Sequence, residues 1–110
     1  MDAQVRSPLV LSWQRRRAVL DDRRSNLTLG AVADAGLQVE GEFTSRCHAT
    51  IERRKQFYVL VDHSTNGTFV QTEDEQVSYV HRGELTLWGE GWISLGEPPS
   101  AASAVRFRHD

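Results

Sequence analysis

The sequence has little of what marks secreted, membrane-bound or strongly charged proteins. It contains a single cysteine, Cys47, so no disulfide can form within the chain, which is typical of the reducing cytosol. No apolar run approaches the roughly 20 residues that a membrane helix needs, and residues 1–7 lack the apolar core of a secretion signal. The formal net charge is only −2, so the overall charge does not attract nucleic acid or an anionic membrane. We therefore expect a cytoplasmic protein with no membrane partner.

Residues suited to catalysis or metal binding are present, but their spacing favours neither. Cys47 directly precedes His48 and His63 directly precedes Ser64, and because neighbours in a strand point to opposite faces, neither pair can readily hydrogen-bond. Gly89–Gly91 lacks the Lys and Ser/Thr that follow in a nucleotide-binding loop, and we interpret it as a tight turn. The histidines are too scattered for a usual zinc site: His48, His63, His81 and His109. The sequence therefore predicts no catalytic residue, no metal and no cofactor.

Apolar and polar residues alternate along several short segments, which is typical of strands with one buried face. These segments are Leu9–Trp13, Leu27–Leu29, Leu37–Val39, Leu85–Leu87 and Val105–His109. Phe57–Val61 is apolar throughout and strand-like, with Phe57, Val59 and Val61 expected on one face. Turn-forming residues such as Asn66–Gly67 and Arg82–Gly83 separate them, and no segment carries a sustained helical stripe. One domain is expected for 110 residues. We therefore predict an all-β sandwich over residues 9–110, after a flexible segment of residues 1–8.

Three clusters of basic residues raise the possibility of nucleic-acid binding. They are Arg15–Arg17, Arg23–Arg24 and Arg53–Lys55, and the chain also has three tryptophans on which bases could stack. Against this, the acidic runs Asp21–Asp22 and Glu73–Glu75 offset the basic clusters, and acidic residues outnumber basic ones by 15 to 13. We interpret the clusters as solvated turns and strand ends, and predict no nucleic-acid partner.

Two polar loops are the places where binding chemistry is expected, because the loops of a sandwich are held by its rigid sheets. One is Thr44–Glu52, with the sequence TSRCHATIE, and the other is Asp62–Val70, with the sequence DHSTNGTFV. The first offers a serine hydroxyl and a guanidinium, and the second a threonine and an asparagine. Such groups could hold one phosphate and a neighbouring peptide group. The residues alone leave a second interpretation open, in which both loops are well-capped turns.

Several ordered motifs resemble those of forkhead-associated (FHA) domains. Ser45–His48 is similar to the Ser-Arg-x-His signature of the family, and Ser64–Val70 is similar to its Ser-Thr-Asn-Gly-Thr segment. Leu29–Gly30 occupies the position of the first family motif, which is a Gly-Arg pair, and Ile93–Gly96 is similar to the last motif. The resemblance covers residues 27–96 and implies a β-sandwich of about eleven mostly antiparallel strands, with binding loops at one end. It also implies a non-catalytic module that binds phosphothreonine peptides.

The resemblance assigns expected roles to four residues of the two polar loops. Ser45 matches the serine that hydrogen-bonds the phosphate, and Arg46 matches the next position, which often adds a contact. Thr65 matches a position near the phosphothreonine. Asn66 matches the asparagine that binds the peptide main chain. We therefore predict a phosphopeptide-binding site formed by these four side chains.

Three further residues are expected to support this site. His48 matches a histidine that braces the loops from inside. Gly67 lets the chain turn tightly with little steric penalty. Gly30 matches the glycine that opens the motif series.

One position departs from the family pattern. The main phosphate-binding arginine of the family follows the glycine that is here Gly30, but this chain has Ala31. Alanine has neither a charge nor a side-chain donor, so the resemblance implies weakened phosphate binding. Arg46, or a basic side chain of another loop such as Arg23 or Arg24, could compensate in part.

A finer resemblance is to the FHA variant appended to some bacterial adenylate/guanylate cyclases, and Ile51–Val70 and Arg82–Gly96 carry it. It implies a regulatory module whose catalytic domain lies elsewhere in the parent chain. The alternative is a phospho-independent interaction or dimerisation module with weak self-association. Trp88, Trp92 and Tyr79 could give it an apolar surface, although we expect them to pack in the core or in turns.

Overall fold

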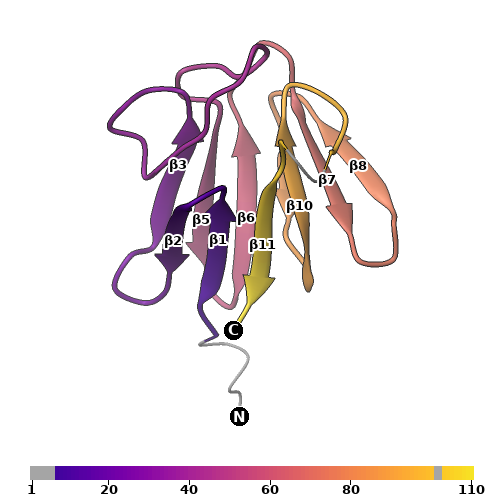
Figure 1. Ribbon diagram of the computed structural model, residues 1–110. Helices are drawn as coiled ribbons and strands as arrows, with labels where there is room; N and C mark the ends of the chain where they lie inside the picture. Colours follow the sequence, from indigo (N-terminus) through magenta and orange to yellow (C-terminus); the bar gives the residue numbers. More distant parts are fainter. Residues whose placement is uncertain (1–6, 101–102) are drawn as a thin grey trace.

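The computed structural model describes residues 7–100 and 103–110, and this part of the chain forms strands joined by turns and loops (Figure 1). The strands are β1 (Leu9–Trp13), β2 (Arg16–Leu20), β3 (Asn26–Gly30), β4 (Leu37–Gln38), β5 (Ala49–Arg54), β6 (Phe57–Asp62), β7 (Thr68–Thr72), β8 (Val77–Val80), β9 (Glu84–Thr86), β10 (Glu90–Leu95) and β11 (Val105–His109). Among the described residues, no helix is long and apolar enough to cross a membrane.

The strands form two sheets that pack face to face. One sheet has the order β2-β1-β11-β10-β7-β8 and the other has the order β4-β3-β5-β6-β9. Every pairing is antiparallel except that of β3 with β4, which is parallel and places Leu29 beside Leu37. The predicted all-β sandwich of about eleven mostly antiparallel strands is therefore confirmed.

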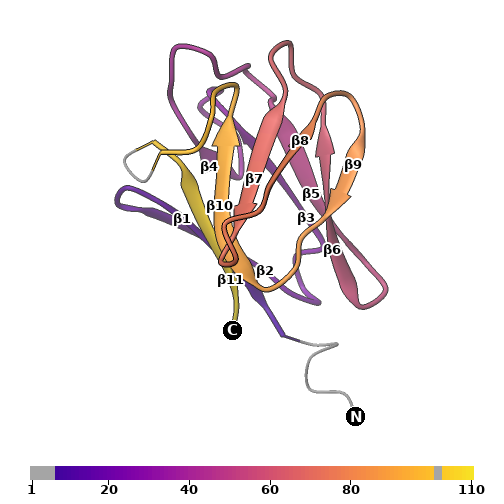
Figure 2. The ribbon, with the colours of Figure 1, turned by 90° about the vertical axis from the view of Figure 1, so that its right-hand side faces the viewer.

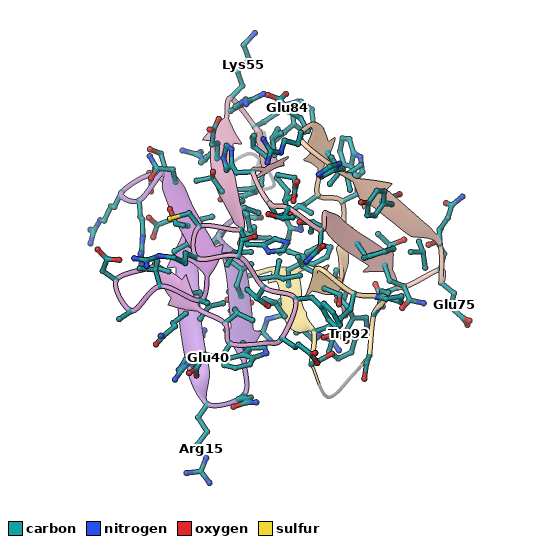
Figure 3. All side chains as sticks on the ribbon, turned by 90° about the horizontal axis from the view of Figure 1, so that it is seen from above. Arg15, Glu40, Lys55, Glu75, Glu84 and Trp92 are labelled. Atoms are coloured by element: carbon teal, nitrogen blue, oxygen red, sulfur yellow. The ribbon has the colours of Figure 1, made fainter. Side chains whose placement is uncertain are left out.

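The core lies between the sheets and follows the alternation in the sequence. In β1, Leu9, Leu11 and Trp13 are buried, while Ser12 is half-buried. The inner faces of the other strands add further large side chains that are almost fully buried, namely Leu27, Leu29, Ile51, Leu60, Ile93, Val105 and Phe107. The core thus consists mainly of aliphatic side chains, and the charged side chains labelled Arg15, Lys55 and Glu75 project outward from the sandwich (Figure 3).

Some strands lack the alternating pattern, and one predicted turn is wrong. Strands β2 and β5 contain adjacent arginines at their exposed ends, and the first three residues of β8 are all exposed. Within Gly89–Gly91 only Gly89 lies in a turn, because Glu90 and Gly91 belong to β10. A Cβ atom at Gly91 would lie 2.0 Å from the carbonyl oxygen of Gln71, so this glycine permits β7 and β10 to approach closely.

The N-terminal segment, expected to be flexible over residues 1–8, is described only at its last two residues. Residues 1–6 lie outside the described residues. The Ser7 carbonyl accepts a hydrogen bond from the Tyr58 hydroxyl at 2.8 Å, and the Pro8 carbonyl accepts one from the Asp110 N–H at 2.9 Å. These two residues are therefore attached to the sandwich.

The connections β3–β4, β4–β5, β6–β7, β8–β9 and β10–β11 lie at one end of the sandwich (Figure 1). Figure 2 shows the β6–β7 and β8–β9 connections side by side at this end, and a hydrogen bond of 2.9 Å from the Asp62 N–H to the Gly83 carbonyl links them. The start of β1 and the end of β11 lie at the opposite end. The two polar loops singled out in the sequence therefore meet on one face of the molecule.

Candidate functional site

The β3–β4 and β4–β5 loops are joined through their main chains. The Ala31 N–H donates to the Ser45 carbonyl at 3.0 Å, and the Val32 N–H donates to the Arg46 carbonyl at 3.1 Å. A Cβ atom at Gly30 would lie 2.0 Å from the Arg46 carbonyl oxygen. Only glycine allows this close approach, so Gly30 fixes how near position 31 lies to Ser45.

A buried histidine links the β4–β5 loop to the β6–β7 loop. The Ser45 N–H donates to Nδ1 of His48 at 3.0 Å, so this nitrogen is unprotonated and Nε2 carries the hydrogen that it donates to the Gly67 carbonyl, 2.8 Å away. Burial lowers the pKa of His48 below its ordinary 6.5, although the bond to Gly67 and the nearby Asp62 act in the opposite direction. His48 is therefore a neutral brace between the two loops.

The β6–β7 connection is organised around a buried carboxylate. Asp62 is 2% exposed and accepts hydrogen bonds from the Thr68 hydroxyl at 2.6 Å, from the N–H and hydroxyl of Ser64, and from the Arg82 N–H at 2.9 Å. Burial acts to raise the pKa of Asp62, but these donors outweigh it, so its pKa lies below the ordinary value. The Asp62 carboxylate thus connects the start of β7, the β6–β7 loop and the β8–β9 connection.

This network explains the many small polar residues between β6 and β7. The Ser64 hydroxyl also accepts a hydrogen bond from the Gly67 N–H at 2.7 Å. Gly67 has a φ of +85°, and a Cβ atom there would lie 2.4 Å from the hydroxyl oxygen of Tyr79. The Tyr79 hydroxyl in turn donates to the Asn66 carbonyl at 3.1 Å. Ser64 and Thr68 therefore face inward and shape the loop, whereas Thr65 and Asn66 remain exposed.

The four predicted binding residues lie on these two adjacent loops. The Thr65 N–H donates to Oγ of Ser45 at 3.3 Å, and the Asn66 amide donates to the Phe43 carbonyl at 3.2 Å. The Ser45 hydroxyl hydrogen remains available because that contact uses only the oxygen. The side chains of Arg46 and Thr65 have no hydrogen-bond or ionic partner among residues 7–100 and 103–110. The structure brings the Ser45 hydroxyl next to the Thr65 main chain, and it leaves the side chains of Arg46 and Thr65 exposed.

Arg23 and Arg24, suggested as substitutes for the missing arginine, lie in the β2–β3 connection and not in the two loops that carry Ser45 and Thr65. Arg24 belongs to the β2–β3 connection, where Asp21 accepts its N–H and that of Arg23. The sequence did not single out Arg82 as a binding residue, because Arg82–Gly83 reads only as a turn. Its Nε donates to the Ser64 carbonyl at 3.3 Å, which places a guanidinium next to the β6–β7 loop.

The structure separates the residues that could have suggested catalysis. Cys47 is exposed, while the adjacent His48 is fully buried. In the part of the chain that is described, no three residues of the types His, Cys, Asp and Glu lie close enough together to hold a metal ion.

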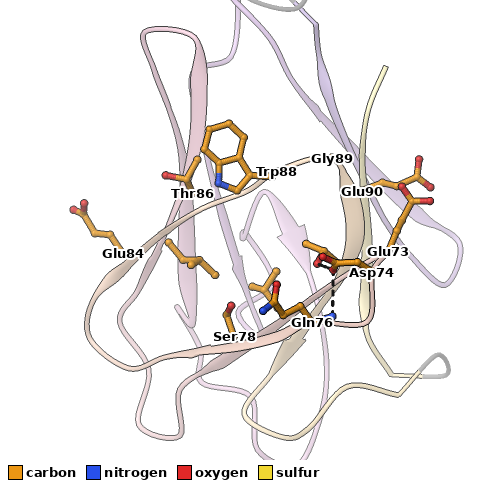
Figure 4. Close-up of a pocket in the computed structure, with 12 residues that line it drawn as sticks. Glu73, Asp74, Gln76, Ser78, Glu84, Thr86, Trp88, Gly89 and Glu90 are labelled. Atoms are coloured by element: carbon orange, nitrogen blue, oxygen red, sulfur yellow. Dashed lines mark hydrogen bonds between the residues drawn. The ribbon is translucent and has the colours of Figure 1, made fainter.

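A groove of about 660 Å³ lies on a different side of the sandwich, between β7, β8 and β9 (Figure 4). Its acidic lining residues are Glu73, Asp74, Glu84 and Glu90. Two of these carboxylates are already paired, Glu84 with Arg54 and Glu90 with Arg106. None of the seven predicted site residues lines this groove, so we keep the candidate site at the loops.

Two of the three aromatic residues expected to pack in the core or in turns are instead exposed. Trp88 is 60% exposed and contacts the ring of Phe57 edge-on, and Tyr79 is 55% exposed with its ring tilted against that of Phe69. Trp92 is half-buried beneath the guanidinium of Arg106. Trp88 lies in the β9–β10 connection, next to the buried Leu87.

Comparison with solved structures shows the same architecture. The FHA-1 domain of Rv1747 from Mycobacterium tuberculosis aligns with a TM-score of 0.73 at 16% identity, covering 94% of this chain and 97% of that one. An FHA domain solved in a study of phosphothreonine-dependent interactions aligns at 0.69 and 26% identity, covering 93% and 96%. The FhaA FHA domain, solved with the intracellular domain of Rv3910, aligns at 0.68 and 27% identity, covering 91% and 99%.

Sequence comparison gives a more specific result. Among curated proteins, none matches this chain by sequence. The family model described as FHA domain matches residues 24–85, which is more than half of the chain. The match begins before β3 and ends within β9, and so it includes both polar loops and His48. The chain therefore belongs to the FHA domain family.

Proposed function

We propose that this FHA domain binds phosphothreonine peptides through Ser45, Arg46, Thr65 and Asn66. The observation that supports this most directly is the contact between Oγ of Ser45 and the Thr65 N–H at 3.3 Å. The two loops meet at this contact, and the polar groups of the residues there suit a phosphate. The neutral brace formed by His48 keeps this arrangement in place before any ligand arrives.

The chemistry of the four side chains matches a phosphorylated peptide. A phosphate offers three acceptor oxygens and about −1.5 to −2 charges. The hydroxyls of Ser45 and Thr65 can each donate to it, and the guanidinium of Arg46 can donate two parallel hydrogen bonds. Asn66 has both a donor and an acceptor, which suits a peptide main chain. The Asn66 amide nitrogen uses one of its two N–H groups on the Phe43 carbonyl, so its second N–H and its oxygen remain for the peptide.

Phosphate affinity in this chain is weakened by Ala31. Its main chain is fixed beside Ser45, so an arginine side chain at this position would start next to the phosphate. Loss of a charged, hydrogen-bonded contact to a ligand costs about 2–5 kcal/mol. Arg46 is the basic residue of the β4–β5 loop that offsets part of this loss.

The similar solved structures agree with this class of ligand. One was described for phosphothreonine-dependent FHA interactions, and another holds the intracellular domain of a second protein. Both cover more than nine-tenths of this chain at 26–27% identity. They support a peptide or protein ligand for the loop end of the sandwich.

A peptide titration tests the proposal. Fluorescence anisotropy with a phosphothreonine peptide library and the matched unphosphorylated peptides should show binding that depends on the phosphate. Ser45→Ala should weaken binding of the best peptide, because it removes a hydroxyl that donates to the phosphate. Equal binding of phosphorylated and unphosphorylated peptides, or binding of neither, would overturn the proposal.

A second candidate function is a phospho-independent interaction or dimerisation module, and the exposure of Trp88 and its contact with Phe57 favour it. Exposed aromatic side chains are common anchors of protein interfaces. Sedimentation over a range of concentrations, compared with the variant Trp88→Ser, tests for self-association. A strict monomer in both would remove dimerisation as a function.

We also propose that the domain is the regulatory part of a longer cytoplasmic, cyclase-type bacterial enzyme. The support is the resemblance of Ile51–Val70 and Arg82–Gly96 to the FHA variant of such enzymes. In this arrangement residues 9–110 fold as one binding unit and the cyclase chemistry belongs to another domain. A cyclase assay on the parent protein, with and without a bound phosphopeptide, tests it. An absent cyclase activity in the parent protein would contradict this proposal.

A further inference from the structure

Arg82 is held beside the candidate site in a conformation that arginine rarely adopts. It lies in the β8–β9 connection with a φ of +58°, a region that Asn, Asp and Gly enter far more easily. Its N–H donates to the buried Asp62 carboxylate at 2.9 Å, and its Nε donates to the Ser64 carbonyl at 3.3 Å. Main chain and side chain are therefore both anchored to the β6–β7 loop.

The outer part of this guanidinium is free. Its two terminal nitrogens have no hydrogen-bond or ionic partner among the described residues. The neighbouring acidic residues are already engaged, because Asp62 is buried among its hydrogen-bond donors and Glu84 pairs with Arg54, and residues 63–67 and 81–83 add only His63 and His81. An exposed guanidinium with a fixed Nε presents its remaining donors in a defined direction, which suits the two oxygens of a carboxylate or phosphate.

The position of Arg82 relative to the phosphate-binding atoms follows from a single peptide group. The Ser64 carbonyl contacts Arg82, and the Thr65 N–H of the same peptide contacts Ser45. In a trans peptide these two groups point in opposite directions. Nε of Arg82 and Oγ of Ser45 therefore lie on opposite sides of this peptide, at most about 9 Å apart.

We propose that Arg82 forms a second anion-binding subsite, so that the ligand is a peptide carrying an oxyanion in addition to its phosphothreonine. This rests on the proposed function and goes beyond it by naming the class of peptide. An extended peptide advances about 3.3 Å per residue, so the second oxyanion lies within three residues of the phosphothreonine. It is either the carboxylate of Asp or Glu or a second phosphate.

A positional scan distinguishes the two sources of the oxyanion. Peptides with a fixed phosphothreonine in an alanine background carry one Glu, or one phosphoserine, at each position within three residues on either side. At one position or more, the acidic residue should improve the Kd of the unaltered domain by about three- to tenfold. The variant Arg82→Gln should lose this improvement while it still binds the all-alanine phosphothreonine peptide. Arg82→Lys keeps the positive charge but lacks the paired donors of a guanidinium, so it should retain part of the improvement in Kd.

The outcomes separate the subsite from the proposed function. If the unaltered domain binds the phosphothreonine peptide but gains nothing from any acidic residue, or if Arg82→Gln keeps the gain, the subsite is wrong and the proposed function stands. Thermal unfolding of each variant shows whether the fold is retained.

A measurement on the unaltered domain covers the case in which no phosphothreonine peptide binds. Titration with an unphosphorylated peptide rich in Glu, followed by NMR of the arginine Nε–H groups, should shift the signal of Arg82. The signal of Arg108, at the opposite end and already near Asp110, is the internal control. A shift at Arg82 alone supports the subsite without the proposed function, whereas no shift, or equal shifts at both, overturns the subsite.

Discussion

His48 is a buried residue whose two ring nitrogens contact both loops of the candidate site. Its Nδ1 accepts a hydrogen bond from the Ser45 N–H, and its Nε2 donates one to the Gly67 carbonyl. One ring nitrogen is therefore an acceptor and the other a donor. The neutral ring can do both at once, whereas a protonated ring has two donors and no acceptor. Protonation of His48 therefore costs the hydrogen bond from the Ser45 N–H.

The first prediction concerns the pH dependence of stability. Because the pKa of His48 is lower in the folded domain than its ordinary 6.5, the unfolded chain binds this proton more readily. Its contribution to stability is complete above about pH 6.5 and decreases as the pH falls below that value, with a slope of at most about 1.4 kcal/mol per pH unit. Urea unfolding at pH 7.5, 6.5 and 5.5 should show this decrease.

Comparing two histidine variants shows whether His48 causes this pH dependence of stability. His48→Gln should be less stable at neutral pH and should show a flatter pH dependence between pH 7.5 and 5.5. The matched control His81→Gln changes an exposed histidine and should keep the slope of the unaltered domain. Equal slopes in all three proteins would contradict the assignment to His48.

The second prediction is that Ala31→Arg raises phosphopeptide affinity. The main chain of Ala31 is already fixed beside Ser45, and the side chain is half-exposed, so a long side chain fits without disturbing the core. Isothermal titration with the best phosphothreonine peptide should give a Kd at least about tenfold lower.

A second arginine on the same loop is the control for this change. Ala33 is exposed and belongs to the β3–β4 loop, so Ala33→Arg adds an equal charge at another position. It should change the Kd by less than about threefold, as expected for a screened surface charge. An equal gain from both variants would mean that net charge, and not position 31, limits binding.

The residues of the site differ in how far the sequence can predict them. Ser45, Arg46, Thr65 and Asn66 belong to contiguous motifs, and the structure places them on adjacent loops. Arg82 has no such motif, because its contact with Ser64 depends on how the chain folds across 18 residues. Contacts of this kind arise from tertiary packing and leave no local pattern in the sequence.

At the scale of the element, the segment from β6 to β7 is a loop folded around a carboxylate. Asp62 ends β6, and the donors that satisfy it come from the turn, from the first residue of β7, and from the β8–β9 connection. A buried carboxylate without such donors would be strongly destabilising. The polar residues that follow β6 are therefore needed to satisfy the buried Asp62 carboxylate, in addition to any role in binding.

The third prediction tests this network through one hydroxyl. Thr68→Val removes the hydroxyl that donates to Asp62 at 2.6 Å and keeps the shape of the side chain. The free energy of unfolding, measured with urea, should fall by about 1–3 kcal/mol, because a charge-assisted hydrogen bond in a buried site is lost.

Strand β7 itself provides the control. The hydroxyl of Thr72 bonds to Asp74, which is exposed, so Thr72→Val should cost less than about 1 kcal/mol. If Thr68→Val were no more destabilising than this control, the carboxylate would not be the organising centre of the segment.

Strands with a single buried face were predictable and the others were not. In β11 the alternation of apolar and polar residues is regular, and in β1 only the apolar Val10 interrupts it, so the structure places both strands where the pattern predicts. In β8 three exposed residues precede the buried Val80, so the strand is defined by its pairing with β7 and not by a pattern of its own. Edge strands of this kind have little buried surface and hence little signal.

At the scale of the whole molecule, the candidate binding loops and the outer ends of β1 and β11 lie at opposite ends of the sandwich. The loops that carry Ser45 and Thr65 lie at one end, and the start of β1 and the end of β11 lie at the other (Figure 1). A protein joined at the end of β11 therefore begins at the end of the sandwich opposite the loops.

The fourth prediction follows from this separation. A globular carrier protein fused after Asp110 should leave the Kd for a phosphothreonine peptide within about twofold, a difference of less than 0.5 kcal/mol. The same carrier inserted between Arg82 and Gly83, in the β8–β9 connection, should weaken binding strongly. Equal effects of the two fusions, in a binding assay at matched concentrations, would contradict this arrangement.

The pairing of β1 with β11 also determines how the domain responds to mechanical force. Leu9 pairs with His109 at the end where both strands leave the sandwich, so a pull on the two ends strains that pair first. The hydrogen bonds between β1 and β11 then break one pair after another from that end. They do not share the load, as they would if the two strands were pulled from opposite ends. Each step withdraws another buried side chain of β1, beginning with Leu9. A protein stretched through this domain would therefore lose its fold at the attachment end while the loops around His48 were still intact.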